Sequence, residues 1–249
     1  MFHPVKLQEY KNYIYQFIII FAKELKKIFL LIYRINENQL KIHLVRHAET
    51  IWHADDKYSG KAEISLTANG IQQSFQLADW AKSQNIDAIY TSGLSRAIIT
   101  AQPSARLLNL VPIVDTNLDE VNYGKIEGLT KAEFKSKFPD VWDKFQVSPA
   151  DTLFPSGESG SEALDRALKF ILGLLQKKDI SEVLLVSHGT LIRLVLTYLL
   201  DQDLNKYRSL FPVINNIGIT TFTLANLKTQ NEIRKNFQIY TYNYYLSTH

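Results

Sequence analysis

The 249-residue sequence contains no cysteine. This absence excludes disulfide bonds, thiolate nucleophiles and zinc sites with cysteine ligands. It is compatible with a reducing compartment, and we expect a cytoplasmic protein. Apolar residues make up 46% of the chain, which indicates a globular protein rather than a disordered one.

The sequence also lacks a large excess of charge of either sign. The formal net charge is +3, and residues 1–40 carry six of the 28 basic and three of the 25 acidic residues. Residues 41–249 therefore hold 22 basic and 22 acidic residues. A nucleic-acid-binding surface usually leaves a basic excess, so we expect no nucleic-acid partner.

No hydrophobic run is long enough to span a membrane. Residues 13–22 and 28–33 are apolar, but the charged segment 23–27 separates them, and a span needs about 18 residues. A signal peptide fits poorly, because no small-residue cleavage site follows the first run. We predict that residues 1–38 form an aromatic, amphipathic helical extension that packs on the domain of residues 39–249 or is loosely attached to it. Contact of residues 13–33 with a membrane surface is the less favoured alternative.

From Leu40 onward, strand patterns and helix patterns alternate. Strands are expected at 40–45, 87–92, 112–115, 182–187 and 217–224, the last of them at an edge of the sheet. Helices are expected at 71–81, 93–110, 162–178 and 190–200. This alternation predicts an α/β fold: a mainly parallel sheet covered by helices on both faces, with the extra N-terminal helical segment. Residues 130–156, with a helical pattern near 132–138, are interpreted as a modest lid-like insertion.

Polar side chains that suit phosphate chemistry follow several of the predicted strands. Arg46 and His47 follow the first strand, and His188 follows the strand at 182–187. Arg96 lies in the first turn of a helix, where free N–H groups favour an anion, and Glu120 follows a short strand. Ligands of open α/β sheets bind at the carboxyl ends of the strands. Two histidines, two arginines and a carboxylate provide a nucleophile, charge neutralisation and a proton donor.

These segments resemble the histidine phosphatase superfamily, also called the phosphoglycerate-mutase-like family. Its motifs R-H-G-x-T, S-x-x-x-R-A, L-x-E-x-x-x-G-x-x-E-G, P-x-G-E-S and S-H-G correspond, in this order, to residues 46–50, 92–97, 118–128, 155–159 and 187–189. The resemblance covers residues 41–225 and does not reach residues 1–38.

The resemblance implies a role for each of five residues. His47 would be the nucleophile that becomes phosphorylated. Arg46, Arg96 and His188 would hold the phosphoryl oxygens. Glu120 would protonate the leaving oxygen and then deprotonate the attacking water. Cationic side chains replace a metal ion in this chemistry, so no metal and no cofactor is expected.

The resemblance also implies a ring of substrate contacts around these five residues. We expect these contacts at Thr50, His53, Lys57, Ser59, Gly60, Tyr123 and Gly189. His53, Lys57 and Ser59 stand where the family often has Asn, Arg and Gln, and Ala48 replaces a glycine of the first motif. These departures affect the expected choice of substrate rather than the central chemistry.

Several other polar residues are interpreted as structural. His43, Glu127 and Glu158 are expected to order their strand or loops. Arg166 and Arg193 are expected on helices, either as salt-bridged surface residues or as residues that support the site from behind its direct contacts. Lys131 is a plausible substrate contact.

The leading hypothesis is a metal-independent phosphatase that hydrolyses small phosphorylated metabolites through a phosphohistidine. The alternatives are a phosphoglycerate mutase and a non-catalytic phosphate-binding module. Mutases of the family have a longer insertion with paired arginines after the glutamate motif, whereas no arginine lies between Gly128 and Ser159 here. A second anionic group of a substrate would then lack a bidentate partner, so weak discrimination between monoesters is expected. The sequence leaves the oligomeric state open.

Overall fold

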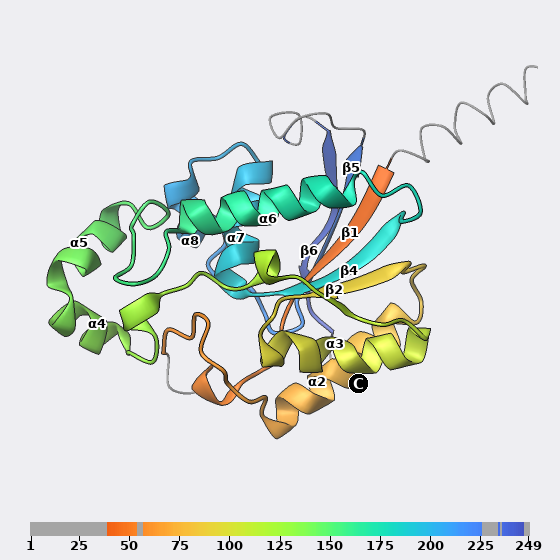
Figure 1. The fold of residues 1–249 in the computed structure, drawn as a ribbon, viewed down its shortest axis with the longest axis horizontal. Helices are drawn as coiled ribbons and strands as arrows, with labels where there is room; N and C mark the ends of the chain where they lie inside the picture. Colours follow the sequence, from red (N-terminus) through yellow and green to blue (C-terminus); the bar gives the residue numbers. More distant parts are fainter. Residues whose placement is uncertain (1–38, 54–56, 226–233, 235, 247–249) are drawn as a thin grey trace, which may run out of the picture. The chain divides into compact units, whose positions relative to one another are not determined.

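The computed structural model describes residues 39–53, 57–225, 234 and 236–246. Six strands form one sheet in the order β3-β2-β4-β1-β5-β6 (Figure 1). Their bounds are β1 Gln39–Arg46, β2 Ala88–Thr91, β3 Ile113–Val114, β4 Glu182–Ser187, β5 Ile219–Ala225 and β6 Phe237–Tyr244. β1, β2, β3 and β4 pair in parallel, which confirms the predicted mainly parallel α/β sheet.

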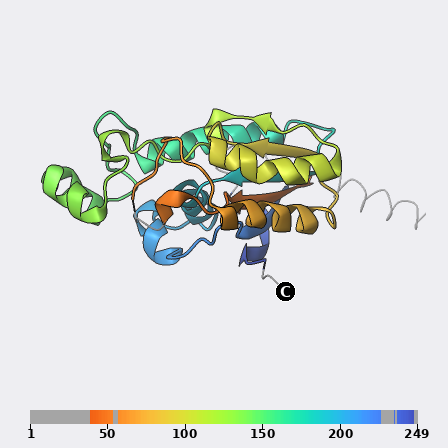
Figure 2. The same cartoon turned by 90° about the horizontal axis from the view of Figure 1, so that it is seen from below.

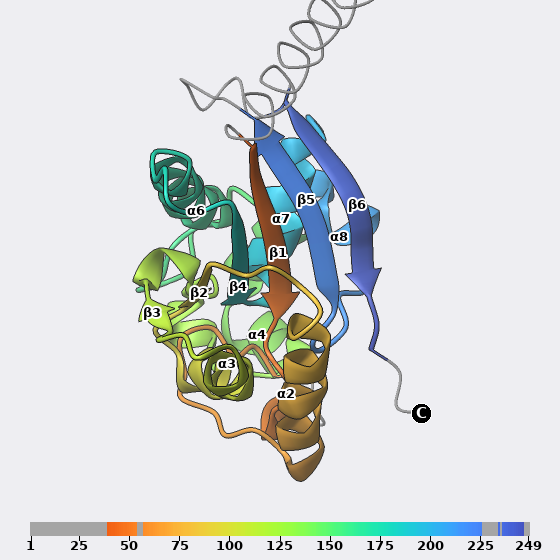
Figure 3. The same cartoon turned by 90° about the vertical axis from the view of Figure 1, so that its right-hand side faces the viewer.

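The strand predicted at the edge of the sheet is an inner strand. β5 lies between β1 and β6 and pairs antiparallel with β6 (Figure 3). β5 is also antiparallel to β1, because the start of β5 meets the end of β1. There, Ile217 N donates to Arg46 O at 3.0 Å. The prediction of an edge position was wrong because β6, which forms the edge, was not recognised in the sequence.

Seven α-helices and four 3-10 turns accompany the sheet among the described residues. The helices are α2 Ala68–Ala81, α3 Ser95–Leu108, α4 Lys131–Lys137, α5 Pro139–Val147, α6 Gly160–Leu174, α7 Gly189–Leu199 and the short α8 Tyr207–Leu210. The 3-10 turns are η1 Ile51–His53, η2 Thr116–Leu118, η3 Gly124–Ile126 and η4 Leu204–Lys206. The helix α3 continues through Pro103.

Helices cover both faces of the sheet, as predicted (Figure 3). On one face, Leu77 of α2 and Ala101 of α3 pack against Val45 of β1. On the other face, Leu168 of α6 and Val195 of α7 belong to the same core cluster as Leu44. Consecutive residues of β1 thus enter opposite cores, as the alternation of side chains along a strand requires.

The predicted lid-like insertion contains two helices, α4 and α5, of which only the first was expected. Figures 1 and 2 show them set to one side of the sheet. Thr130 caps α4 together with Glu133 in a capping box, and Pro139 begins α5. Proline suits the first helical position because its missing N–H would have no partner there. Phe134 and Phe145 are buried and join the insertion to the core of the α6–α7 face.

The register of the parallel strands brings the polar strand ends together. Arg46 lies opposite Ser187, so His47 and His188 follow adjacent strands at the same edge. His47 N donates to Ser187 O at 2.9 Å, and Ser92 N donates to Val186 O at 3.1 Å. The ends of β1, β2 and β4 therefore meet at one place.

The predictions for residues 1–38, including a membrane-surface contact through residues 13–33, lie outside the described residues. Within the part of the chain that the structure describes, no helix is both long and apolar enough to cross a membrane. The division into residues 1–38 and 39–249 and the cytoplasmic location stay predictions.

Candidate active site

Two buried histidines lie side by side at the carboxyl ends of β1 and β4. The ring centroids of His47 and His188 are 5.0 Å apart, and their planes meet at 52°. His47 is 4% exposed and His188 is fully buried. The parallel pairing of the two strands produces this approach, so the two histidines predicted as site residues do come together.

The hydrogen bonding of His47 defines its tautomer. His47 Nδ1 lies 2.7 Å from Ala48 O, and a carbonyl oxygen only accepts, so Nδ1 carries the proton. In the neutral ring, Nε2 is then the unprotonated nitrogen, and neutral imidazole is the nucleophilic form. The surrounding backbone is held by Asn216 Nδ2, which donates to His47 O at 3.0 Å, and by Ala48 N, which donates to Thr100 Oγ1 at 3.0 Å.

Arg96 Nε and His188 Nδ1 are buried nitrogen atoms without a hydrogen-bond partner among the described residues. The rest of each side chain is held: Arg96 donates to Gly60 O at 2.6 Å and to Ala62 O at 2.8 Å, and His188 Nε2 lies 2.7 Å from Ser92 Oγ. An unsatisfied buried polar group costs about 1–3 kcal/mol, so an oxygen-rich ligand at this place would satisfy both.

The environment of His188 keeps its imidazole neutral. Burial lowers its pKa well below the ordinary 6.5, and the positive charges of Arg96 and Arg46 lower it further. Burial also lowers the pKa of Arg46 to about 10, with a contribution from the charge of Arg193. Arg46 is still protonated near pH 7, and its Nη1 donates to Ile214 O at 2.6 Å. The site thus presents fixed positive charge from its arginines.

Glu120 is fixed by backbone N–H groups at the start of α7. Its Oε2 accepts from Thr190 N at 3.0 Å, and its Oε1 accepts from Leu191 N at 3.0 Å and from Val121 N at 2.9 Å. The N-terminus of a helix stabilises a negative group. His188 is the residue that precedes this helix, so α7 places Glu120 and His188 at the same end of the site.

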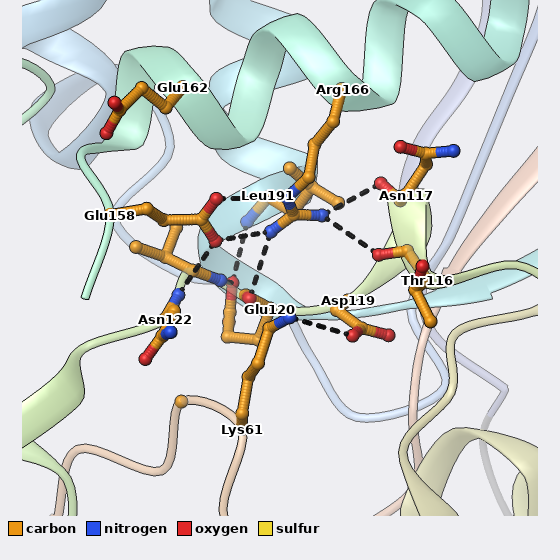
Figure 4. Close-up of polar contacts among 12 residues, drawn as sticks. Lys61, Thr116, Asn117, Asp119, Glu120, Asn122, Glu158, Glu162, Arg166 and Leu191 are labelled. Carbon is orange, nitrogen blue, oxygen red and sulfur yellow. Dashed lines mark hydrogen bonds and ion pairs between the residues drawn. The ribbon is translucent and has the colours of Figure 1, made fainter. Parts of the chain in front are cut away.

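Arg166 of α6 ties the Glu120 loop to the loop of the P-x-G-E-S segment (Figure 4). Its Nη2 donates to Glu120 O at 3.0 Å and to Glu158 Oε1 at 2.7 Å, and its Nη1 donates to Asn117 O at 2.8 Å. Glu158 Oε1 also accepts from Asn122 N at 2.9 Å. Burial raises the pKa of Glu158, but its hydrogen bonds from Arg166 and Asn122 outweigh this and lower it overall. Both residues therefore have the structural role expected of them.

A cavity of about 220 Å³ lies beside Arg46 and Glu120. Of the predicted site residues, the cavity wall contains Arg46, Glu120, Lys57, Ser59, Tyr123 and Gly189. His47, Arg96 and His188 are not part of the wall. Tyr123 is buried, which raises its pKa well above 10, and its hydroxyl lies 2.9 Å from Thr190 Oγ1. Lys131 also lines the cavity.

Three predicted substrate contacts are not in the cavity wall of the described residues. Thr50 is buried and forms an isolated β-bridge with Leu66. Gly60 is buried, and its carbonyl accepts a hydrogen bond from Arg96, so it positions that guanidinium through its backbone. The backbone of His53 lies in η1, and its side chain lies outside the described residues.

The cavity contains two arginines that the sequence did not indicate. Arg193 of α7 and Arg208 of α8 both line it. Arg193 donates to Phe211 O at 2.7 Å and to Pro212 O at 3.0 Å, so its partners are carbonyl oxygens rather than the carboxylate of a salt bridge, which was one of its two expected roles. The inference that a second substrate anion would lack an arginine was therefore wrong, because it considered only the insertion after Gly128.

The remaining polar residues interpreted as structural lie away from the cavity. His43 Nε2 contacts Glu182 Oε1 at 2.8 Å, and its Nδ1 lies 2.9 Å from Thr221 Oγ1. Glu127 accepts from Lys61 N at 2.8 Å and holds the loop that carries Gly60. Among the described residues, no group of three or more histidines and carboxylates has the arrangement of a metal site.

Comparison with known proteins identifies the family. A model of the histidine phosphatase superfamily (branch 1) matches residues 42–234. The chain belongs to this superfamily. Members of the histidine phosphatase superfamily use a histidine nucleophile, and the predicted family, fold and enzyme class are thereby confirmed.

Relatives of this superfamily member include hydrolases and mutases. The chain is 30% identical over 170 residues to phosphoserine phosphatase 1 of Hydrogenobacter thermophilus, covering 68% of this chain and 81% of that protein. It is 30% identical to a probable phosphoglycerate mutase, GpmB, of Erwinia tasmaniensis, covering 69% of this chain and 80% of the relative. A solved structure of phosphoserine phosphatase from Entamoeba histolytica matches with a TM-score of 0.69 and 29% identity, covering 82% of this chain and 96% of that one.

Proposed function

We propose that the protein hydrolyses small phosphate monoesters without a metal ion, through a phosphohistidine at His47. The observation that carries this proposal is the hydrogen bond from His47 Nδ1 to Ala48 O, which leaves Nε2 as the unprotonated nitrogen of the neutral ring. Beside it, Arg96 Nε and His188 Nδ1 are buried polar atoms without a hydrogen-bond partner in the described part of the chain. A nucleophile next to unsatisfied nitrogen groups suits a phosphoryl group.

In the first step, His47 Nε2 attacks phosphorus and the bond from phosphorus to the alcohol oxygen breaks. Glu120 gives its proton to the leaving oxygen, so a neutral alcohol departs. The hydrogen bond from His47 Nδ1–H to Ala48 O stabilises the positive charge that the imidazole ring acquires. Arg46 and Arg96 hold the phosphoryl oxygens and reduce the cost of the charge that develops on them.

In the second step, a water molecule attacks the phosphohistidine. The Glu120 carboxylate takes a proton from this water, the bond between nitrogen and phosphorus breaks, and inorganic phosphate forms. Glu120 ends protonated and His47 ends neutral, so both groups return to their starting state. No redox partner or metal ion enters this balance.

A phosphoglycerate mutase is the second candidate. The similarity to the probable mutase of Erwinia tasmaniensis favours it, and Tyr123 and Lys131 line the cavity. The phosphoserine phosphatases of Hydrogenobacter thermophilus and Entamoeba histolytica support the hydrolytic alternative. A small phosphorylated metabolite is the proposed substrate in both cases.

Acid quenching during turnover of p-nitrophenyl phosphate tests the proposal. We expect an acid-labile, base-stable phosphoprotein in the native enzyme. His47→Ala should abolish both this adduct and phosphate release. His43→Asn, which alters a histidine away from the cavity, is the matched variant and should keep the adduct. Full activity of His47→Ala would rule out the mechanism.

A further inference from the structure

A second cavity adjoins the first, and three basic residues line both. The second cavity has a volume of about 790 Å³. Lys131, Arg193 and Arg208 belong to the walls of both cavities. We refer to these three residues as the outer basic cluster. The residues that line the second cavity include no aspartate or glutamate, and Glu120 is the acidic residue that lines the first.

The two arginines of the outer basic cluster are held without being neutralised. Arg193 donates to two backbone carbonyl oxygens, those of Phe211 and Pro212. The guanidinium of Arg208 stacks over the ring of Phe145, with its central carbon 4.9 Å from the ring centroid. Phe145 is buried, so it offers a fixed surface to that guanidinium. Neither arginine forms an ion pair with a carboxylate of the described residues.

The outer basic cluster lies next to the proposed phosphoryl site. A Cβ atom added to Gly189 would lie 3.3 Å from Arg46 Nε and 3.7 Å from Arg193 Nη1. Gly189 directly follows His188 in the chain, so Arg193 lies close to the residues proposed to bind the phosphoryl group. Like charges that converge in this way repel one another, and an anion between them relieves the repulsion.

The charge of the cluster is a local feature of the molecule. Residues 41–249 contain equal numbers of basic and acidic residues. The cluster therefore does not follow from a general basic character of the domain. It is built by segments distant in sequence: Lys131 begins α4, Arg193 lies on α7 and Arg208 lies on α8 (Figure 1).

We infer that the outer basic cluster binds a second anionic group, a carboxylate or a phosphate, carried by the leaving alcohol of the substrate. This inference rests on the proposed function, because it places the phosphoryl group of the same substrate at His47. A guanidinium pairs with either anion through two parallel hydrogen bonds. The preferred substrates are thus monoesters with an anionic leaving group, and Arg208 is a specificity-determining residue.

Matched pairs of esters test this inference on the full-length protein. The first pair is 3-phosphoglycerate and glycerol 3-phosphate, which differ in a carboxylate against a hydroxymethyl group. The second pair is fructose 1,6-bisphosphate and fructose 6-phosphate. We expect the anion-bearing ester of at least one pair to have a kcat/KM about tenfold to a hundredfold higher, in line with hydrogen bonds between charged groups. The pair that responds identifies the anion as carboxylate or phosphate.

Substitution of Arg208 provides the decisive comparison. Arg208→Gln should reduce the ratio of kcat/KM values within the responding pair about tenfold, mainly through KM, and Arg208→Lys should restore part of it. Arg106→Gln, which changes an exposed arginine on α3, should leave the ratio unchanged. Equal ratios in Arg208→Gln and the native enzyme would overturn the inference while phosphate release continues.

A binding measurement separates failure of this inference from failure of the proposed function. Calorimetry with the His47→Ala variant measures ligand affinity without turnover. The anion-bearing ester should bind about tenfold more weakly when Arg208→Gln is added. If binding shows this loss but the native enzyme forms no phosphohistidine, the proposed function fails and the second anion site stands. Unchanged affinity would overturn the anion site.

Discussion

Arg166 donates a hydrogen bond from Nη2 to the backbone carbonyl of Glu120 at 3.0 Å. The same guanidinium pairs with Glu158, so a residue outside the cavity wall holds the proposed acid–base residue through its main chain. Glu120 also receives N–H groups of α7 at its carboxylate. Its position is thus set from both sides, by α6 through the backbone and by α7 through the side chain.

The first prediction concerns Arg166 as a positioning residue. Arg166→Met should lower kcat about tenfold to a hundredfold, because displacement of a catalytic group by about 1 Å has effects of this size. The loss should be larger for an alkyl phosphate than for p-nitrophenyl phosphate, whose leaving group needs no proton. Arg106→Met is the control. An equal loss for both esters would show that Arg166 supports stability alone.

The second prediction concerns Glu120 itself. Glu120→Gln keeps the size of the side chain but removes the transferable proton, and general acid catalysis contributes roughly 10²–10⁴-fold. Steady-state rates for a series of esters should show a steeper dependence on the pKa of the leaving alcohol than in the native enzyme. Glu127→Gln changes a carboxylate that binds Lys61 N and serves as the matched variant. If Glu120→Gln lowers all rates by one factor, another group donates the proton.

The sequence predicted the strand ends well because the chemistry and the hydrophobic pattern agree there. β1 alternates apolar and polar residues and β4 has a continuous apolar run, and they end at Arg46-His47 and just before His188, so parallel pairing alone brings the histidines together. β6 was missed because most of its residues are exposed and its pattern signals no burial. The error over β5 followed directly from that omission.

The outer part of the site could not be predicted in this way. Arg193 and Arg208 line the same cavity because α7 packs against α8 and Arg208 lies over Phe145 of α5, and no local pattern encodes that packing. Arg166 binds backbone carbonyl oxygens, which every residue possesses, so its partners leave no signal in the sequence. The sequence was searched for paired arginines only in the insertion after Gly128, which has none, whereas the fold supplies arginines to the cavity from two other segments.

The third prediction concerns the pH dependence of stability. Because burial lowers the pKa of His188 well below 6.5, the folded protein binds fewer protons than the unfolded chain below about pH 6.5, the ordinary value of histidine. The contribution of neutral His188 to the free energy of unfolding should therefore be fully present above this pH. The free energy of unfolding should fall as the pH is lowered, by up to about 1.4 kcal/mol per pH unit for one such group.

Urea denaturation at pH 7.5 and 5.5 measures this effect. His188→Asn should reduce the difference between the two free energies of unfolding. Burial also lowers the pKa of His43, partly opposed by Glu182, so His43→Asn should reduce the difference as well. A stability difference that neither variant changes would contradict the assignment of these histidines as neutral.

The fourth prediction concerns metal ions. Phosphate release should be unchanged after dialysis against EDTA, because Arg46, Arg96 and the imidazole groups take the place of a Lewis acid in the proposed mechanism. Rates before and after chelation, with a magnesium-dependent phosphatase as the positive control, provide the measurement. Loss of activity that added Mg²⁺ or Mn²⁺ restores would require a different mechanism.

The last prediction separates hydrolysis from mutase activity. Both reactions begin with a phosphohistidine at His47, and they differ in what reacts with it next. A mutase must retain the dephosphorylated intermediate in a closed pocket and return the phosphoryl group to it, whereas a phosphatase must release the alcohol and admit water. The outer basic cluster would hold a carboxylate in either case, so affinity for 3-phosphoglycerate does not distinguish them.

The insertion after Gly128 favours hydrolysis. The family resemblance implies that a mutase would close its pocket with a longer insertion and paired arginines, while here about thirty residues, without arginine, contain the two short helices α4 and α5. We therefore expect 3-phosphoglycerate with a bisphosphoglycerate primer to yield inorganic phosphate faster than 2-phosphoglycerate. Both products are measured in one time course, with His47→Ala as the blank. Faster accumulation of 2-phosphoglycerate would assign the protein to the mutases, because the phosphohistidine would then react with the retained glycerate rather than with water.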